Sequence, residues 1–436
     1  MRFRFRDIPL LLLNPAGRRQ LRFSGFQFLW PVLSRVAWIH RRTVARGTRV
    51  VAVVGSYGKT STARALAAVL CDPSYQLSDD NCLSLVAARV LRLRRRDRYA
   101  VIEVGVEQPG EMATYVPVIR PNITVVTSIG TEHHRSMKDI ETTRAEKAEM
   151  VRGLAPSGLA VLNGDDANVL WMRGQTRART VTFGFGEAND VRAAEMSLGD
   201  WPAGTRFRVH VGGQARDVRV RLVGRPGVCA ALAAVAVGLA EGFPLDDIVA
   251  ALATVIPAPG RLEPVPLPNG AVILRDEYKS TLETIEVALD VLSELPARRR
   301  LVVLGEVSEP PGKQGDVYRH LGGRVGGIAS RAIFLCRERD SACRAGAVQG
   351  GMPPSAIVKA GDDLFRATDA LKDGLGPGDV VLIKGRDTQR LDRITLLLQG
   401  RAVGCRLTTC KATSARCGGC PSVERGWGES RVLAVR

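Results

Sequence analysis

Short apolar runs alternate with helical segments along most of this chain. Continuous apolar stretches lie at residues 50–54, 99–105, 122–127 and 159–163, and polar or glycine residues bound each of them. Runs of this kind are typical of parallel strands that are covered on both faces. Segments with helical periodicity follow at residues 63–70, 138–152 and 228–240. The alternation predicts a doubly wound α/β domain with a mostly parallel sheet.

The same alternation begins again after Pro257-Ala258-Pro259-Gly260. Strands are predicted at residues 272–274, 301–304, 332–335 and 380–383, with a helix at residues 284–292. We therefore expect a second, Rossmann-like α/β domain. The predicted division is a basic, aromatic N-terminal segment (1–46), a central nucleotide-binding domain (47–258), the second domain (259–400) and a cysteine-rich tail (401–436).

The first apolar run leads into a glycine turn and a helix start. The turn reads Gly55-Ser56-Tyr57-Gly58-Lys59-Thr60-Ser61. Gly55 and Gly58 allow backbone N–H groups to face a phosphate, Lys59 reaches the terminal phosphates, and the Thr60 hydroxyl can hold Mg²⁺. The commoner P-loop has a glycine where Val53 stands, so this is a shorter variant. The pattern predicts ATP or GTP binding, and a glycine turn that binds nothing is the alternative.

Two further strand ends carry candidate metal ligands. Glu103 closes a buried apolar run, where a carboxylate is costly unless it is paired or bound to metal. In a P-loop protein this is the place of the acid that completes Mg²⁺ coordination opposite Thr60. His133 follows the next strand end and is a candidate second ligand. A solvated loop histidine is the alternative reading.

Length and charge narrow the class of protein. The 436 residues are 45% hydrophobic, and no apolar run approaches the ~20 residues that cross a bilayer. A soluble, cytoplasmic protein of two or three domains is expected. The formal charge of +18 suits an anionic partner, such as nucleic acid, an acidic lipid surface or a phosphorylated substrate. A general bias toward arginine explains the charge equally well.

The basic, aromatic residues of the N-terminal segment allow two interpretations. They include Phe26, Phe28, Trp30 and Trp38, with an arginine-rich start at residues 1–6. The segment does not read as a signal peptide, because its apolar core is interrupted and no cleavage site follows. It could lie on the anionic inner face of a membrane. Docking on its own domain is the alternative.

The cysteines are unevenly placed. The tail carries a C-x4-C-x6-C-x2-C pattern, whereas the other cysteines lie in apolar or helical contexts and read as buried thiols. Four thiolates within sixteen residues predict a structural Zn²⁺ site. An iron–sulfur cluster and unligated or redox-active thiols are alternatives. The tail cysteines are Cys405, Cys410, Cys417 and Cys420, and the others are Cys71, Cys82, Cys229, Cys336 and Cys343.

The motifs of the two domains, in their order along the chain, resemble those of the Mur ligase family over about residues 50–400. The nearest branch adds D-alanyl-D-alanine to a UDP-muramoyl tripeptide. The matching segments are the glycine turn above, Glu103-Val104-Gly105-Val106-Glu107-Gln108-Pro109-Gly110-Glu111-Met112, Ile129-Gly130-Thr131-Glu132-His133, Lys147-Ala148-Glu149, Val161-Leu162-Asn163-Gly164-Asp165-Asp166, Gly260-Arg261-Leu262-Glu263, Asp276-Glu277-Tyr278-Lys279, Val303-Leu304-Gly305-Glu306 and Leu382-Ile383-Lys384-Gly385-Arg386.

The resemblance implies an ATP-dependent carboxylate–amine ligase of cell-wall peptide synthesis. Such enzymes phosphorylate a carboxylate and let an amine attack the acyl phosphate, which gives an amide, ADP and phosphate. By the family pattern Thr60 and Glu103 hold one Mg²⁺, and His133 and a carbamylated Lys147 hold the other. The implied catalytic residues are Lys59, His133, Lys147, Lys279 and Lys384. The implied cofactor-binding residues are Gly55, Ser56, Tyr57, Gly58, Lys59, Thr60, Ser61, Asn163, Arg261 and Asp276.

Three departures from the family pattern affect the expected substrates. The residues that usually contact adenine are replaced within residues 224–230, and the signature after Asp276 is Tyr278-Lys279-Ser280-Thr281-Leu282. Both the adenine contacts and the amine-donor pocket are therefore expected to differ. Only about 45 residues precede the first strand. We expect an acceptor that is not UDP-linked, such as a lipid-linked precursor or a polyglutamate chain.

Two other classes of protein also fit parts of the sequence. The charge and the zinc-like tail suit a nucleic-acid-dependent P-loop NTPase. The lost adenine contacts suit a catalytically degraded scaffold. A ligase with a carboxylate acceptor and an amino-acid or dipeptide donor is favoured, and a nucleic-acid partner is not expected.

Overall fold

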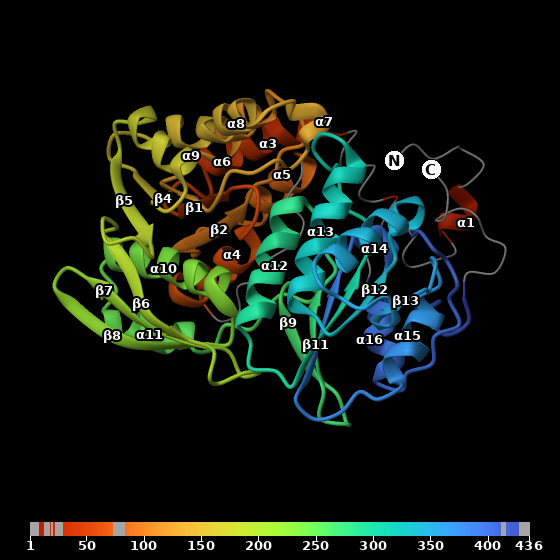
Figure 1. Ribbon diagram of the computed structural model, residues 1–436. Coiled ribbons are helices and arrows are strands. Elements are labelled where there is room, and N and C mark those ends of the chain that lie inside the picture. Colours follow the sequence, from red (N-terminus) through yellow and green to blue (C-terminus); the bar gives the residue numbers. More distant parts are fainter. Residues whose placement is uncertain are drawn as a thin grey trace. The chain divides into compact units, whose positions relative to one another are not determined.

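The computed structural model describes residues 8–12, 18, 21, 29–72, 83–410 and 416–426. The arginine-rich start at residues 1–6, the aromatic positions Phe26 and Phe28, and Cys82 lie outside these described residues. The chain divides into two compact units, residues 26–257 and residues 258–436, and the second is grouped with residues 1–25, which include α1 (Ile8–Leu12). Figure 1 shows both units with their labelled helices and strands.

A mostly parallel sheet forms the centre of the first unit. Its described strands run in the order β2-β1-β3-β4-β5-β6-β7-β8, parallel as far as β6 and antiparallel beyond it. Their bounds are β1 (Arg49–Val54), β2 (Tyr99–Glu103), β3 (Ile123–Val126), β4 (Leu159–Asn163), β5 (Arg179–Gly184), β6 (Val191–Ser197), β7 (Thr205–Val211) and β8 (Gln214–Val220).

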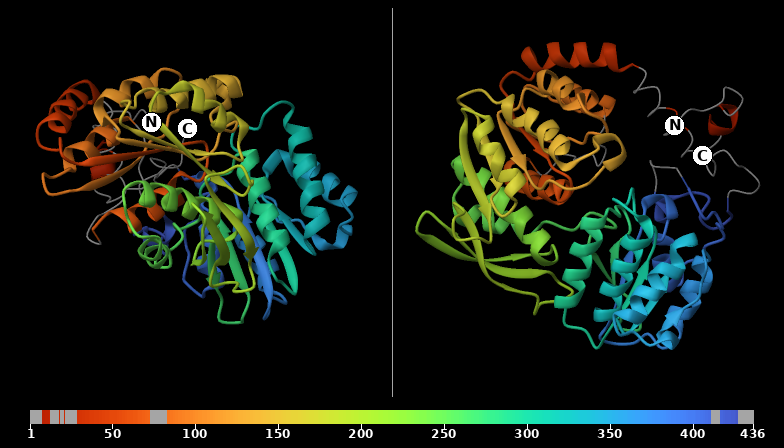
Figure 2. Two further views of the ribbon diagram at one scale, coloured as in Figure 1. Left: turned by 90° about the vertical axis from the view of Figure 1, so that its left-hand side faces the viewer. Right: turned by 45° about the horizontal axis from the view of Figure 1, so that its top comes forward.

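The helices cover both faces of this sheet, as Figure 2 shows. Alternate residues of β1 face opposite sides, so Val51 and Val53 join one core cluster and Val50 and Ala52 join the other. Because both sides are buried, the strand is apolar throughout. One face packs against α4 (Lys59–Leu70), α10 (Gly224–Ala240) and α11 (Leu245–Leu252), and the other packs against α5 (Leu83–Arg92), α6 (Glu111–Ile119) and α8 (Ile140–Arg152). The short α7 (His134–Met137) and α9 (Ala167–Leu170) complete this unit.

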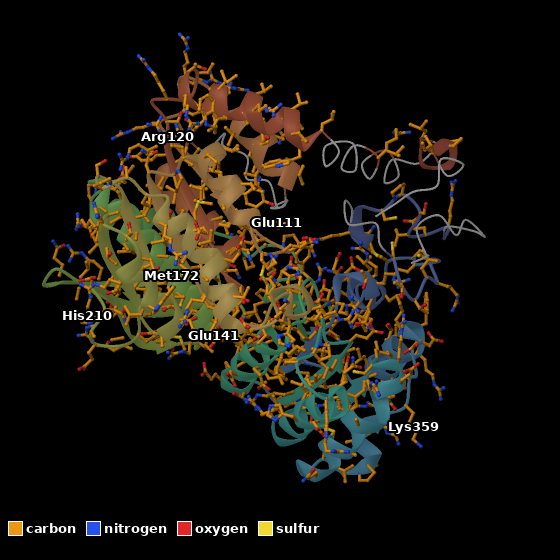
Figure 3. The ribbon with its side chains drawn as sticks, turned by 90° about the horizontal axis from the view of Figure 1, so that it is seen from above. Glu111, Arg120, Glu141, Met172, His210 and Lys359 are labelled. Atoms are coloured by element: carbon orange, nitrogen blue, oxygen red, sulfur yellow. The ribbon has the colours of Figure 1, made fainter. Side chains whose placement is uncertain are left out.

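The antiparallel strands β6, β7 and β8 extend the sheet beyond its nucleotide-binding part. Their apolar residues, including Val209 and Val218, join the same core as α10. β7 also carries His210, the residue that follows the buried Val209, and Figure 3 labels this histidine.

One helix of the expected N-terminal segment packs on the first unit. In α3 (Trp30–Arg42), Ala37 and Arg41 are buried, and the Trp30 ring meets the Tyr115 ring edge to face, with centroids 5.6 Å apart. The Arg41 guanidinium donates to the carbonyl of Ile119 (Nε, 2.9 Å) and to Asn122 Oδ1 (Nη2, 3.0 Å). Burial lowers the pKa of this guanidinium to about 10. The helix is therefore part of the first unit.

The second unit is built on a second twisted sheet. Its described strands run in the order β13-β12-β11-β14-β10-β9, and only the edge pair β9 and β10 is antiparallel within this described set. The strands are β9 (Glu263–Pro266), β10 (Val272–Asp276), β11 (Arg299–Leu304), β12 (Arg331–Phe334), β13 (Ile357–Val358) and β14 (Asp379–Lys384). The helices are α12 (Leu282–Glu294), α13 (Gln314–Ile328), α14 (Asp340–Gln349), α15 (Leu364–Lys372) and α16 (Asp392–Leu398).

These elements confirm the predicted fold class, a P-loop α/β domain followed by a second α/β domain. Within the described residues, no helix has both the length and the apolar content that a membrane crossing requires.

Candidate active site

The glycine turn between β1 and α4 has a backbone that requires glycine. Gly55 has φ of +146°, and a Cβ at this position would lie 2.1 Å from Thr127 Oγ1. Gly58 has φ of +82° and is the N-cap of α4. Ser61 lies in the first turn of the helix. The loop thus brings the positive end of α4 to the carboxyl edge of the sheet, where phosphate binds in such folds.

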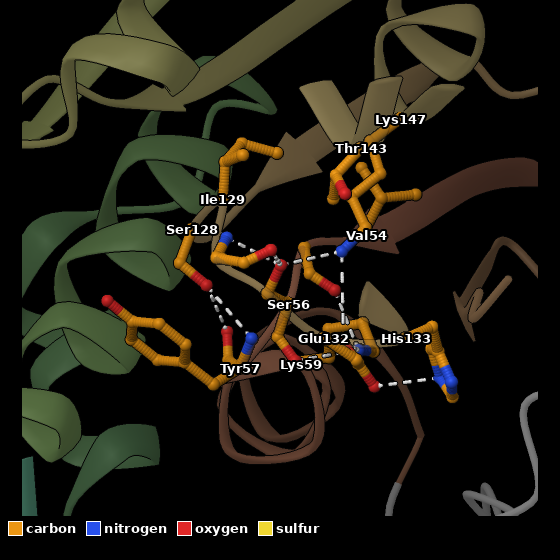
Figure 4. A network of polar contacts seen from close by, with 12 residues as sticks. Val54, Ser56, Tyr57, Lys59, Ser128, Ile129, Glu132, His133, Thr143 and Lys147 are labelled. Atoms are coloured by element: carbon orange, nitrogen blue, oxygen red, sulfur yellow. Dashed lines mark hydrogen bonds and ion pairs between the residues drawn. The ribbon is translucent and has the colours of Figure 1, made fainter. Parts of the chain in front are cut away.

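The residues after β3 hold this loop in place, as Figure 4 shows. Tyr57 N donates to Ser128 Oγ (2.9 Å), and Ser56 N donates to the carbonyl of Ser128 (2.8 Å). The Thr127 hydroxyl donates to the carbonyl of Tyr57 (2.5 Å). The loop is therefore fixed by its neighbour strand before any ligand binds, which lowers the ordering cost of binding.

Lys59 is buried and folded over its own loop. Its Nζ donates to the carbonyls of Gly55 (2.7 Å) and Ser56 (3.3 Å), and it lies 3.6 Å from Glu132 Oε2. An ammonium held beside the loop can neutralise charge on a phosphate that the loop binds.

Thr60 and Glu103 meet across two neighbouring elements. The Thr60 hydroxyl donates to Glu103 Oε2 at 2.9 Å, and both side chains are buried. β2 ends at Glu103 and pairs with β1, so the carboxylate reaches the start of α4. A hydroxyl and a carboxylate oxygen are ligands that suit Mg²⁺. The pair therefore fits the predicted metal position beside the loop.

Glu132 links several of the predicted residues, although the sequence analysis gave it no role. Its Oε2 lies 3.8 Å from Lys147 Nζ, and its Oε1 lies 3.3 Å from His133 Nε2. Lys147 Nζ also donates to Ser56 Oγ at 2.8 Å. Glu132 thus joins Lys59, Lys147 and His133 into one network at the P-loop. Its position after a strand end, beside His133, is the feature of the sequence that indicates a functional role for Glu132.

His133 occupies an unusual backbone position. Its φ is +58°, it is the N-cap of α7, and its side chain is about one-third exposed (32%). A left-handed non-glycine residue is uncommon and is often found at functional sites. The Glu132 carboxylate lies near both His133 and Lys147 and so links these two predicted metal ligands, whose role stays a prediction.

Two further predicted nucleotide contacts lie at Asn163 and at the start of α10. Asn163 Nδ2 donates to the carbonyl of Thr127 (2.9 Å), so it supports the strand end that holds the P-loop. In the stretch where the adenine contacts are replaced, the Arg225 guanidinium stacks 3.7 Å from the Phe185 ring centroid. A cation over an aromatic ring offers a flat surface to a base instead of hydrogen-bonding side chains.

The second unit brings together most of its predicted residues at the carboxyl edge of its sheet. Lys384 Nζ donates to Asp276 Oδ2 (2.5 Å) and to the carbonyl of Lys279 (2.6 Å). Burial raises the pKa of the Asp276 carboxyl and lowers the pKa of the Lys384 ammonium, so each charge depends on the other. Arg261 lies close by, with its guanidinium 4.4 Å from the Tyr278 ring centroid.

The tail cysteines lie beside α16. Cys405, Cys410 and Cys417 are buried and Cys420 is partly buried, and burial raises the pKa values of the Cys417 and Cys420 thiols. In the described part of the chain, no three His, Cys, Asp or Glu side chains are grouped closely enough to hold a metal ion. Zinc binding therefore stays a prediction.

Two family models match the chain. The Mur ligase middle domain matches residues 53–238, and the Mur ligase, glutamate ligase domain matches residues 260–386. The UDP-N-acetylmuramoyl-tripeptide–D-alanyl-D-alanine ligase of Mycobacterium tuberculosis is 29% identical over 396 residues, which cover 85% of this chain and 77% of that protein. The enzyme of the same name from Escherichia coli is 33% identical over 278 residues, which cover 63% of this chain and 60% of that protein.

Solved structures show the same fold. MurF from Acinetobacter baumannii superposes with a TM-score of 0.75 at 24% identity, covering 85% of this chain and 81% of that one. MurF from Thermotoga maritima, solved in complex with ADP, superposes with a TM-score of 0.74 at 19% identity. The match covers 85% of this chain and 83% of that one. With the P-loop network and both family domains present, the chain belongs to the Mur ligase family of ATP-dependent peptide ligases.

Proposed function

We propose that this chain uses ATP to join an amino acid or dipeptide to a carboxylate of a cell-wall peptide precursor, through an acyl phosphate. The observation that carries the proposal is the network in which Glu132 joins Lys59, Lys147 and His133 beside a braced P-loop. Phosphoryl transfer depends on positioning and on neutralising charge, and this network supplies fixed charges at the loop.

The first unit would form the acyl phosphate. The P-loop amides and Lys59 bind and orient the terminal phosphates, and Ser56 and Ser128 keep the loop in shape. Thr60 and Glu103 would hold one Mg²⁺, and His133 with a carbamylated Lys147 would hold the second. When bound, these ions supply charge neutralisation at the transferring phosphoryl group.

The second unit would select the amine. Asp276 and Lys384 fix the loop that carries Lys279, so that the donor meets a rigid edge of the sheet. The acyl phosphate is exposed to hydrolysis until an amine attacks it. Delivery of the donor by this unit would favour aminolysis over hydrolysis.

The donor and acceptor are proposed from chemistry and from the relatives' names. The relatives are named for a UDP-N-acetylmuramoyl tripeptide and D-alanyl-D-alanine. The changed signature at residues 278–282 favours a donor pocket of different shape. D-alanyl-D-alanine is therefore the first donor to test, with single amino acids beside it.

Coupled turnover tests the function. ATP hydrolysis is measured with pairs of a muramoyl-peptide, lipid-linked or polyglutamate acceptor and an amine donor, and mass spectrometry detects the amide. We expect ADP, phosphate and amide in equal amounts. Hydrolysis stimulated by RNA instead, without amide, would support a nucleic-acid-dependent NTPase. No nucleotide binding at all would support a scaffold.

We also propose that α3 contacts an anionic membrane surface. Val32, Val36 and Ile39 on its outer side are 47–57% exposed, although they are large and apolar. Arg35 is exposed on the same helix, and the helix carries no acidic residue. Apolar side chains flanked by arginines suit the interface of an acidic bilayer.

Vesicle sedimentation tests this contact. Binding to vesicles with phosphatidylglycerol should exceed binding to phosphatidylcholine vesicles, and it should fall with salt. Val36→Glu should weaken it severalfold, whereas Val348→Glu, at an equally exposed apolar residue of α14, should not. Equal loss in both variants would refute a role for α3.

Finally, we propose that the tail binds one structural Zn²⁺ through its four cysteines. Four thiolates suit zinc, and the apolar cluster around Leu396, Cys417 and Val423 is small for a segment that must dock. Binding requires the thiols to draw closer than they are here. Metal analysis should find one zinc per chain, lost in Cys417→Ser and kept in Cys229→Ser. Neither zinc nor iron in the purified protein would dismiss the site.

A further inference from the structure

Two cysteines of the second unit lie in direct contact, although six residues separate them along the chain. Cys336 follows the end of β12 at Phe334, and Cys343 lies near the start of α14. Their sulfur atoms are 3.6 Å apart, and the Cys343 thiol donates to Cys336 Sγ. Both residues are buried and both thiols are free. The proposed function gives neither cysteine a role.

The backbone holds the two cysteines within reach of a covalent bond. Cys336 is positioned by β12, whose last residue pairs with Leu304 of β11. α14 packs so closely on α13 that a Cβ at Gly322 would collide with the carbonyl of Cys343. A disulfide has about 2.05 Å between its sulfurs, so the two Sγ atoms must approach each other by about 1.5 Å. A change of rotamer moves a cysteine sulfur farther than this.

The segment between the two cysteines covers them only thinly. None of the side chains at residues 337–342 is buried. Arg337 has φ of +50°, which is uncommon for a residue with a side chain, and its guanidinium pairs with Glu306 near the surface at 2.9 Å. Partly exposed ion pairs contribute little, and segments with few buried contacts open at low free energy. Local opening therefore exposes both sulfurs to a small reagent.

The closed segment keeps the pair reduced. Burial, followed by the bond from Cys343, raises the pKa of the Cys336 thiol well above its ordinary value. A protonated thiol is a poor nucleophile. Oxidation of the pair therefore requires both an open segment and a sustained supply of oxidant.

Cys336 also supports the peptide that follows β11. Its thiol lies within hydrogen-bond distance of the carbonyls of Leu304 (3.3 Å) and Gly305 (3.2 Å). The N–H of Gly305 donates to the carbonyl of Lys384 (2.7 Å). Gly305 is buried, and a disulfide has no S–H group to donate to its carbonyl. A buried carbonyl that loses its donor is destabilising.

This peptide leads to the loop that is proposed to present the amine donor. Ser308 N, three residues after Gly305, donates to the carbonyl of Ser280 at 2.6 Å. Ser280 follows Lys279, whose carbonyl accepts from Lys384 Nζ. A movement at Gly305 therefore acts on a segment that is bonded both to Lys384 and to the Lys279 loop.

We propose that Cys336 and Cys343 form a reversible disulfide that acts as a redox switch on the second unit, with hydrogen peroxide as the oxidant. One sulfur attacks the peroxide, the O–O bond breaks, and a sulfenic acid and water form. The second sulfur then displaces the hydroxyl as water, and the S–S bond forms. Two thiols thus lose two electrons to one peroxide, which becomes two water molecules. Only the effect of the bond on amide formation rests on the proposed function.

Peptide mapping of the whole chain tests the bond without any turnover. After hydrogen peroxide, alkylation and trypsin, the peptides at residues 332–337 and 340–344 should be linked, lighter than the two free peptides by two hydrogen atoms. Dithiothreitol should separate them. Cys343→Ser should leave no link, whereas Cys71→Ser, in the first unit, should keep it. The proposal is wrong if Cys336 and Cys343 stay open to alkylation, or if Cys336 alone is oxidised to a sulfinic acid.

Hydrogen exchange and coupled turnover test the switch. In the linked protein, amide exchange at residues 305–308 and 279–281 should rise severalfold, and amide formation should fall about fivefold or more until dithiothreitol is added. Cys343→Ser should keep its turnover in peroxide. Unchanged exchange or turnover in the linked protein, or equal inactivation of Cys343→Ser, would overturn the switch. If exchange rises as expected but the reduced protein forms no amide, the proposed function fails and the disulfide stands.

Discussion

Lys384 and Asp276 are register partners on the parallel strands β14 and β10, and their side chains form a buried ion pair with 2.5 Å between Nζ and Oδ2. The lysine side chain is 1% exposed. The pair therefore fixes the two strand ends that frame the proposed donor site, and the lysine acts through the loop that it holds.

Lys384→Ala should destabilise the protein by about 3–5 kcal/mol, because it leaves a buried carboxylate without its partner. Denaturant unfolding measures this loss. The double variant Asp276→Asn/Lys384→Met, which removes both charges, should recover most of the stability. If the single variant were as stable as the wild type, the ion pair would not contribute to the stability of the fold.

The same variant should lose amide formation while still forming acyl phosphate. The residues proposed for phosphate transfer lie in the first unit, so positional isotope exchange in ATP should persist in the folded variant. If Lys384→Ala abolished the exchange and left amine selectivity among surviving turnovers unchanged, the lysine would belong to the phosphate machinery instead.

Lys59→Ala should lower ligase turnover by at least about 100-fold, because removing a preorganised charge from a transferring group typically costs this much. Its stability should change little compared with Lys384→Ala, since Lys59 donates mainly to loop carbonyls. Measured turnover near the wild-type rate would refute the assignment of this loop.

Lys147→Ala should be inactive and should regain activity when short carboxylates such as acetate or propionate are added. The added anion would supply the oxygen ligand that a carbamate provides. Lys138→Ala is the control, because Lys138 is exposed just before α8. Full activity of Lys147→Ala without rescue would show that no carbamate is needed.

Glu277→Gln should flatten the pH dependence of stability between about pH 5 and pH 8. Burial raises the pKa of the Glu277 carboxyl from its ordinary 4.5 to about 7, and the bond from Arg275 only partly offsets this. A raised pKa means that stability is complete below pH 4.5 and falls as the pH rises through 7. The loss is about 3 kcal/mol at most. If the free energy of unfolding changed with pH in the same way for the variant and the wild type across this range, the prediction would be wrong.

Arg225→Ala should raise the KM for ATP severalfold with little change in the KM for the amine donor. The guanidinium lies over the Phe185 ring, in the stretch where the usual adenine contacts are replaced, and we expect it to stack on the base. Arg221→Ala is a nearby control at an exposed arginine. An unchanged KM for ATP would mean that the base is bound elsewhere.

The sequence predicted well what depends on local patterns. Apolar runs and a glycine turn determine strands and a P-loop wherever both faces of a sheet are buried, and β1, β3 and β14 appear within a few residues of their predicted positions. The hydrogen bond between Thr60 and Glu103 agrees with their expected proximity, which follows from the pairing of β1 with β2, and their role as Mg²⁺ ligands stays a prediction.

What the sequence did not predict are partners far apart along the chain. Glu132 was passed over beside His133, because its contacts with Lys59 and Lys147 depend on how α4 and α8 approach each other. The stacking of Arg416 on Tyr278 spans more than a hundred residues, and no local pattern signals it. Such contacts follow from tertiary packing.

Arg41 connects α3 to the strands that carry the P-loop. Asn122 Oδ1 accepts both from Arg41 and from Val50 N, so one amide oxygen ties the helix to the starts of β1 and β3. The opposite ends of these two strands carry Gly55 and Thr127, which shape the P-loop. A protein cut back to residue 47, as though the first helix were a leader, would keep the Val50–Asn122 bond between these strand starts but lose the guanidinium that fixes Asn122 and the Ile119 carbonyl from the side of α3.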